Sequence, residues 1–185
     1  MARTRRLQAF LLALGASASA TLAQVFVVDA AGGPGAQFTS LPAAVAAVPS
    51  GSVLRVRAGT YAPFTLAQKS LVVLGDDAAT VVIDLTSDLV IGPLATSDNV
   101  RLRHLTLRGS ALFVSGGLRI QGAQGSVVFE DLHLVSASGS NLFAPARLVL
   151  TDSPNTHLLG CRLLADPNPV DGGSSAPQCT LTRSR

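Results

Sequence analysis

The sequence contains a repeat of about 28 residues, and this repeat restricts the possible folds more than any other feature. Four similar segments, each beginning with Ser or Asn and continuing with apolar residues at alternate positions, occupy residues 70–75, 99–104, 126–131 and 155–160, at spacings of 29, 27 and 29 residues. A second series occupies residues 89–91, 118–120 and 148–150, at spacings of 29 and 30 residues. Two independent series that share one period indicate a chain built from stacked structural repeats.

Within each repeat, apolar and polar residues alternate, as they do in half-buried β-strands. Inward positions are expected for Val100, Leu102, Leu105 and Leu107, and outward positions for Arg101, Arg103, Thr106 and Arg108. The alternation shifts by one residue at His104, Asp131 and Gly160, which predicts a bend between two strands at each position. No run is long enough for a crossover helix, and the Leu-x-x-Leu-x-Leu-x-x-Asn pattern of leucine-rich repeats is absent. The chain is therefore predicted to be an all-β parallel β-helix, or solenoid.

A short helix is predicted over about residues 40–48, ahead of the repeats. Thr39 or Ser40 is a candidate N-cap, and Pro42 lies in the first turn, where its missing N–H costs little. The apolar stripe of this helix consists of Leu41, Ala44, Val45 and Val48. So short a helix is not stable alone in water, so we expect it to cap the first coil of the solenoid. A peripheral helix beside a β-sandwich is the alternative.

Residues 1–23 are predicted to be a secretory signal peptide. Its basic start consists of Arg3, Arg5 and Arg6. A short apolar segment at residues 9–15 is followed by small residues, with cleavage expected after Ala20 or Ala23. The short apolar segment disfavours a membrane-anchoring helix. Residues 24–185 then form the β-helix domain, with coils over about residues 52–185 and an incomplete C-terminal end. The mature protein is expected in the periplasm, at the cell surface or outside the cell.

Cleavage changes the charge of the protein. The full chain has 14 Lys and Arg against 11 Asp and Glu, and the three arginines of the signal peptide account for the difference. No basic run remains in the mature chain, so nucleic acid is not an expected partner. No apolar run reaches the roughly 18 residues of a membrane span, so no span is expected after cleavage.

Three segments resemble the opening of secreted bacterial pectin-lyase-like proteins. They are residues 38–61, which end in Gly59-Thr60-Tyr61, residues 69–75 (Lys-Ser-Leu-Val-Val-Leu-Gly) and residues 80–84 (Thr-Val-Val-Ile-Asp). The resemblance extends over about residues 25–165 and implies a right-handed, single-stranded parallel β-helix with a short N-terminal capping helix. The chain resembles a truncated member of that superfamily. Because the superfamily includes pectate lyases, pectin methylesterases, polygalacturonases and proteins without known activity, the resemblance implies a fold more than a function.

Candidate site residues follow from stacking the repeats in phase. Stacking places Arg103 over Glu130, His104 over Asp131, and Thr106 over His133 and then Arg162. In one interpretation these are ladders of opposite charge, each of which stabilises neighbouring strands by about 0.2–1 kcal/mol. In the other, Arg103, His104, Glu130 and Asp131 are catalytic candidates, clustered at a bend where they bind a cation or abstract a proton. The sequence favours the first interpretation.

The residues themselves predict no cofactor and no metal site. Zinc-ligand spacing, a phosphate-binding glycine loop and a nucleophile–histidine pairing are all missing from the sequence. Asp76, Asp77 and Asp84 lie near predicted turns, where solvated acids are common. Ca²⁺ binding is implied as a possibility by the family resemblance alone. Neither the methylesterase-like Asp-Phe-aliphatic-Phe-Gly segment nor the polygalacturonase-like Asn-Thr-Asp occurs.

The aromatic residues argue against a strong platform for sugars. The chain has no Trp, one Tyr and seven Phe. Phe129 is expected in the core together with Phe26 and Phe38, while Phe113 and Phe143 are expected to stack on one face.

The two cysteines, Cys161 and Cys179, align with inward positions on different faces of the coil. This placement favours two free thiols over a disulfide, and the sequence excludes neither alternative.

The sequence predicts a secreted β-helix protein of unknown activity, a surface or polysaccharide-interacting scaffold without a recognisable catalytic site. The alternative is a carbohydrate-active enzyme of the polysaccharide lyase or pectin esterase type, or a fragment of one. A purely structural surface module is a third interpretation. Expected partners are polysaccharide or another component of the cell envelope. Residues 180–185 resemble the start of another coil without a cap, so self-association through this end is also expected.

Overall fold

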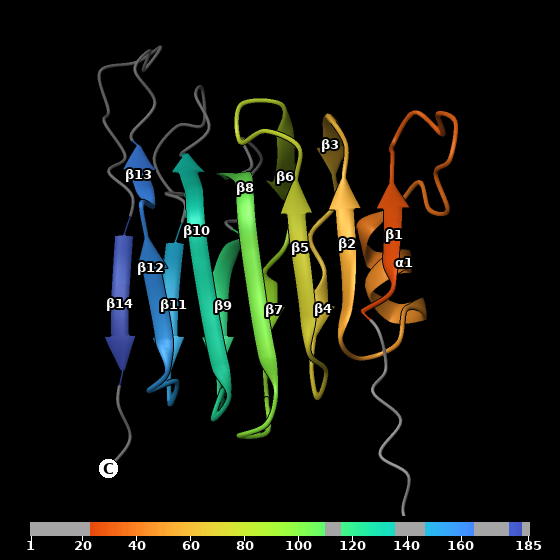
Figure 1. Cartoon of the computed structure of the whole chain (residues 1–185). Helices are drawn as coiled ribbons and strands as arrows, with labels where there is room; N and C mark the ends of the chain where they lie inside the picture. Colours follow the sequence, from red (N-terminus) through yellow and green to blue (C-terminus); the bar gives the residue numbers. More distant parts are fainter. Residues whose placement is uncertain (1–22, 110–115, 136–146, 165–177, 183–185) are drawn as a thin grey trace, which may run out of the picture.

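The computed structural model describes residues 23–109, 116–135, 147–164 and 178–182, which form a parallel β-solenoid (Figure 1). The first sheet contains β1 (Val25–Val28), β2 (Ser52–Val56), β5 (Leu71–Gly75), β8 (Asn99–Gly109), β10 (Ser126–Val135) and β12 (Thr156–Leu159), in that order. The second sheet contains β4 (Thr65–Leu66), β7 (Leu89–Ile91), β9 (Gly117–Gln121), β11 (Arg147–Thr151) and β14 (Gln178–Thr182). The third face contains β3 (Gly59–Tyr61), β6 (Val81–Leu85), β13 (Arg162–Leu164) and the second halves of β8 and β10.

The predicted all-β parallel β-helix is confirmed. Each strand pairs in parallel with the equivalent strand one coil later, for example β5 with β8 and β8 with β10. In Figure 1 the strands of the first sheet rise in front, those of the second sheet descend behind, and the coils advance from right to left. This sense of winding is right-handed.

The predicted bends are present inside the long strands. His104 in β8 and Asp131 in β10 have φ angles of 52° and 49°, and Gly160 has a φ of 64°. Asp and His are among the residues that tolerate this left-handed conformation best. In β8 the residues before the bend pair with β5 and those after it pair with β6. One long strand therefore turns from the first sheet onto the third face, which explains the shift in the alternation.

Two glycines allow neighbouring coils to approach at such corners. A Cβ atom on Gly75 would lie 2.1 Å from the carbonyl oxygen of His104. A Cβ atom on Gly92, whose φ is +113°, would lie 1.9 Å from the carbonyl oxygen of Gln121. Both contacts are with backbone atoms, which cannot rotate away as a side chain can.

The core lies between the sheets and is built from columns of aliphatic residues in register. One column consists of Leu54, Val73, Leu102 and Phe129, all with 0 % exposure. The inward positions predicted for Val100, Leu102, Leu105 and Leu107 are confirmed. Removing one such side chain from water contributes roughly 1.5–3 kcal/mol, so the columns supply most of the favourable folding energy.

The aromatic and cysteine predictions are confirmed in part. Phe26 and Phe38 are partly buried against the core, with ring centroids 6.1 Å apart in an edge-on arrangement. Cys161 is a free thiol, half-buried against the same core. The backbone of Cys179 pairs with Leu148, as the alignment predicted. Phe113 and Phe143 lie outside the described residues, as does the side chain of Cys179.

The predicted helix, α1 (Leu41–Ala47), lies behind β1 and β2 at the N-terminal end of the solenoid (Figure 1). It buries Leu41, Ala44 and Val45, and the following Val48 is also buried. Ser40 occupies the N-cap position, but its side chain makes no capping hydrogen bond. The other end is capped by Lys69, whose Nζ donates to the carbonyl oxygens of Val45 and Val48, both at 2.7 Å. The positive charge of Lys69 also interacts favourably with the partial negative charge at the C-terminal end of the helix.

The N-terminal edge of the first sheet is covered by the chain itself. The backbone N–H of Val27 in β1 donates to Oε1 of Gln37 at 2.6 Å, and its carbonyl oxygen accepts from the N–H groups of Gln37 and Phe38. The N–H of Asp29 donates to the carbonyl oxygen of Phe38 at 2.9 Å. These bonds occupy the outer side of β1, where another strand would otherwise pair.

Residues 1–22, which hold nearly all of the predicted signal peptide, lie outside the described residues. Within the described ranges, no helix has the length and apolar character needed to cross a membrane.

Candidate functional site

The candidate residues Arg103 and Glu130 form an ion pair on the outer face of the first sheet. They are partners in the β8–β10 register, and Nε of Arg103 lies 2.5 Å from Oε2 of Glu130. Arg101, two residues earlier and on the same face, places its Nε 3.4 Å from Oε1 of the same carboxylate. Both arginine side chains are more than one third exposed, at 49 % and 38 %. The single carboxylate of Glu130 thus pairs with two guanidinium groups. The three side chains together carry a net charge of +1.

The other two candidates, His104 and Asp131, lie at the bends and do not join that ion pair. Oδ1 of Asp131 lies 3.5 Å from Nε2 of His133, two residues along the same strand. Within the described residues His104 makes no side-chain hydrogen bond or ion pair. The backbone register that was predicted for Thr106, His133 and Arg162 is confirmed. Of the four candidates, Arg103 and Glu130 therefore form a cross-coil ion pair, Asp131 contacts His133 instead of His104, and His104 stands apart from both contacts.

Further arginine–carboxylate pairs join neighbouring coils elsewhere on the surface. Arg55 pairs with Asp76 at 2.8 Å, Arg119 with Asp88 at 2.9 Å, and Arg108 with both carboxylate oxygens of Asp84 at 2.7 and 2.9 Å. Asp76 and Asp84 were expected to be solvated turn acids, and the structure places both in ion pairs. Asp77 fits that expectation, because Oδ1 accepts the backbone N–H of Ala79. Exposed pairs of this kind stabilise a fold by about 0–1 kcal/mol each, so their main effect is to fix the register.

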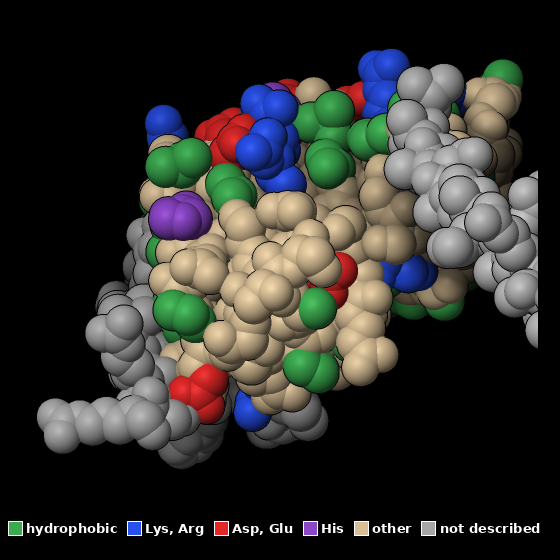
Figure 2. Space-filling view, turned by 60° about the horizontal axis from the view of Figure 1, so that its bottom comes forward, with side chains coloured by type: hydrophobic (Ala, Val, Ile, Leu, Met, Phe, Trp, Pro, Cys, Tyr) green, Lys and Arg blue, Asp and Glu red, His purple; other side chains and the backbone are tan. Residues whose placement is uncertain are grey.

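Figure 2 shows where these charges lie. Basic, acidic and hydrophobic side chains gather along the upper edge of the view, which is the outer face of the first sheet. Below them lies a broad area made mostly of backbone and uncharged polar side chains, formed by the turns that lead from the second sheet to the first, with a few charged side chains among them. Charged residues also lie outside the first sheet, as the Arg119–Asp88 pair on the second sheet shows.

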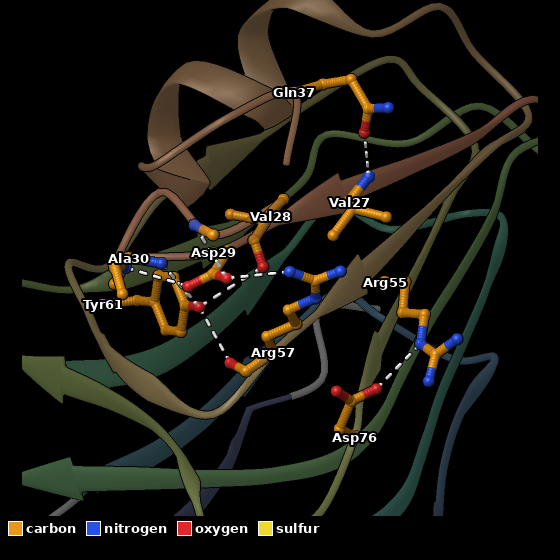
Figure 3. A network of polar contacts seen from close by, with 11 residues as sticks. Val27, Val28, Asp29, Ala30, Gln37, Arg55, Arg57, Tyr61 and Asp76 are labelled. Carbon is orange, nitrogen blue, oxygen red and sulfur yellow. Dashed lines mark hydrogen bonds and ion pairs between the residues drawn. The ribbon is translucent and has the colours of Figure 1, made fainter. Parts of the chain in front are cut away.

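A polar network that the sequence did not predict joins the loop after β1 to the segment after β2 on the next coil (Figure 3). Oδ1 of Asp29 accepts the N–H of Ala31 at 2.9 Å, and Oδ2 accepts Nη1 of Arg57 at 3.0 Å and the N–H of Gly33 at 3.2 Å. The Tyr61 hydroxyl donates to the carbonyl oxygen of Arg57 at 2.8 Å. These contacts fix the loop after β1, which carries the residues that cover the sheet edge.

Two groups of this network have pKa values that are shifted in opposite directions, each for its own reason. The hydrogen bond from the Ala31 N–H, followed by that from Arg57, lowers the pKa of Asp29. Burial raises the pKa of Tyr61. Asp29 precedes a glycine-rich loop, which is the only sequence feature that pointed to a turn acid here.

Comparison with protein-family models, with curated proteins and with solved structures gives no match. The resemblance to pectin-lyase-like proteins gains no support from these comparisons and stays a prediction. The described residues contain no group of three or more His, Cys, Asp or Glu side chains arranged to hold a metal ion.

The Arg103–Glu130 pair is predicted to act as a structural ladder. In a double-mutant cycle with Arg103→Ala and Glu130→Ala, chemical denaturation should give a coupling free energy of about 0.5 kcal/mol that decreases at high salt. The control cycle combines Glu130→Ala with Arg119→Ala on the second sheet, and the two effects should add. If Arg103→Ala abolished a detected activity without lowering the melting temperature, the ladder interpretation would be wrong.

Asp29 is predicted to make the stability depend on acid pH. Because its pKa is lower in the folded state than in the unfolded state, its contribution is complete above the unfolded value of about 3.9 and is lost as the pH falls through the folded value. The melting temperature of the wild type should therefore exceed that of Asp29→Asn most clearly above about pH 5, and the difference should shrink towards about pH 2. A difference in melting temperature between the two proteins that stays constant over this pH range would contradict the prediction.

Proposed function

We propose that this protein is a secreted, non-catalytic scaffold of the pectin-lyase-like type, whose outer face on the first sheet binds an acidic polysaccharide of the cell envelope or its surroundings. Secretion rests on the basic, apolar and small-residue pattern of residues 1–23. The binding proposal rests on the geometry of the described coils.

The observation that carries the proposal is the in-register repetition of outward positions on this face. Successive coils lie about 4.8 Å apart, so equivalent positions recur at a constant spacing along the solenoid, although the residues that occupy them differ. One outward column contains Val53, Val72, Arg101 and Val128, and the next contains Arg55, Leu74, Arg103 and Glu130. A polymer with repeating units can contact the same column in several coils at once, which raises the overall affinity of individually weak contacts.

The chemistry of the face favours a polymer that carries carboxylate groups. Guanidinium groups bind carboxylates through two parallel hydrogen bonds. Arg101 and Arg103 share one acidic partner and remain partly exposed, so they retain donors for a ligand. The aliphatic side chains of Val72, Leu74 and Val128, which flank these arginines in the same columns, offer apolar contacts to sugar rings.

A carbohydrate-active enzyme of the lyase or esterase type is the second candidate function. The Asp131–His133 contact favours it, because a carboxylate beside an imidazole can position that ring for proton transfer. A role for Ca²⁺ in such a reaction is implied by the family resemblance alone.

The test uses the protein purified after export, screened by calorimetry against polyuronates and against neutral glucans, with and without Ca²⁺. We expect binding to polyuronates, which the double variant Arg101→Ser/Arg103→Ser should weaken by about tenfold, equivalent to about 1.4 kcal/mol. The matched control is Arg119→Ser, which removes an ion-paired arginine from the second sheet and should leave the affinity unchanged.

Two further readouts separate the candidate functions. The intact mass of the exported protein should correspond to cleavage after Ala20 or Ala23. Incubation with polyuronates should produce no ultraviolet-absorbing unsaturated uronates and no released ester groups. Either product, lost in His133→Gln, would favour the enzyme instead, and the absence of saturable binding would reject the scaffold.

A further inference from the structure

Glu130 has an unusual position, because it is the one acidic side chain among the described residues that reaches the two arginines on the outer face of β8. Its Oε1 lies near Nε of Arg101 and its Oε2 near Nε of Arg103. In the preceding coil the same two outward columns hold Val72 and Leu74, which carry no charge. The charge state of this part of the face therefore depends on Glu130 alone.

The contact of Glu130 with these arginines differs from the other ion pairs on the surface. Arg108 donates from both Nε and Nη2 to the two carboxylate oxygens of Asp84, at 2.7 and 2.9 Å. Glu130 instead divides its two oxygens between two guanidinium groups, so neither group forms two parallel bonds with it. Nε of Arg103 is also shielded from solvent and makes no hydrogen bond within the part of the chain that the structure describes. The contact is therefore mainly an attraction between charges, without the geometry of a strong fork.

The same arginines are the groups that a ligand carboxylate would use. A guanidinium offers two parallel N–H groups either from Nε and one Nη or from both Nη atoms. Glu130 occupies the Nε side of Arg101 and Arg103, which excludes the first arrangement. Its negative charge weakens the second arrangement, because it repels an incoming carboxylate. Glu130 thus takes the place that an acidic ligand requires.

We propose that Glu130 is an internal competitor of the acidic ligand and thereby excludes ligands that carry a single carboxylate. This inference rests on the proposed binding of polyuronates to this face. A free uronate competes with a carboxylate that the fold already holds beside both arginines, at a high effective concentration. A polymer overcomes the competition because its contacts with other coils add to the affinity. Glu130 therefore makes the face selective for polymers over single acidic sugars.

The test compares the exported wild type with Glu130→Gln, which keeps the shape of the side chain and removes its charge. By calorimetry, the variant should bind polygalacturonate about fivefold more tightly than the wild type, since exposed ion pairs are worth up to about this factor. Monomeric galacturonate, which can contact this site alone, should gain by a similar factor in titrations followed by nuclear magnetic resonance. Circular dichroism checks the fold of each variant.

Two controls separate this effect from a general change of charge. Asp84→Asn removes one negative charge from the partner of Arg108 on the third face, and it should leave both affinities unchanged. Glu130→Gln introduced together with Arg101→Ser and Arg103→Ser should give no gain over the arginine double variant, because no guanidinium is left to release.

The outcomes distinguish the inference from the function on which it rests. Wild-type binding of polygalacturonate that Glu130→Gln leaves unchanged or weakens would overturn the inference and leave the proposed function standing. An equal gain in Asp84→Asn, or in the absence of the two arginines, would also overturn the inference alone. A lack of saturable binding in both the wild type and Glu130→Gln would reject the proposed function and the inference with it.

Discussion

The structure depends on one constraint, which is that each coil lies on the previous one with its strands parallel and its side chains in register. In a parallel sheet the side chains of equivalent residues stack directly above one another. An inward leucine must therefore meet an inward aliphatic residue of the next coil, and a shift of one residue would turn the entire apolar column outward. The column from Leu54 to Phe129 satisfies this constraint over four strands.

The surface chemistry follows from the same constraint. The repeat brings arginines and carboxylates that are 21 to 31 residues apart in sequence to within ion-pair distance. These pairs are weak individually, but an incorrect register would separate all of them at once. The same repetition spaces the outward positions of the first sheet evenly, and the proposed binding of a polymer rests on this spacing.

Much of this architecture could be predicted from the sequence because it repeats. The two repeat series predicted the pairing of Arg103 with Glu130, and the shift in the alternation predicted the bends at His104 and Asp131, which the structure forms with positive φ angles. The stripe of apolar residues and the early proline predicted α1. In each case, local patterns carry the information that the fold uses.

The features that were missed depend on contacts without a repeat. Lys69 caps α1 from 21 to 24 residues away, and the Asp29–Arg57–Tyr61 network joins two coils through a loop that occurs once. Periodicity gives no information on such contacts. The candidate site was predicted only to the level of backbone register, since the side-chain geometry decided that Asp131 contacts His133 and that Arg101 shares Glu130.

The register of β8 and β10 can be measured directly by nuclear Overhauser contacts between backbone protons of the isotope-labelled protein. The parallel register predicts contacts between residues 27 apart on both sides of the bend, such as Arg103 with Glu130 before it and Thr106 with His133 after it. A separation that changes by one residue across the bend, or contacts of the antiparallel type, would contradict the stacking on which the fold, the ion pairs and the proposed binding face depend.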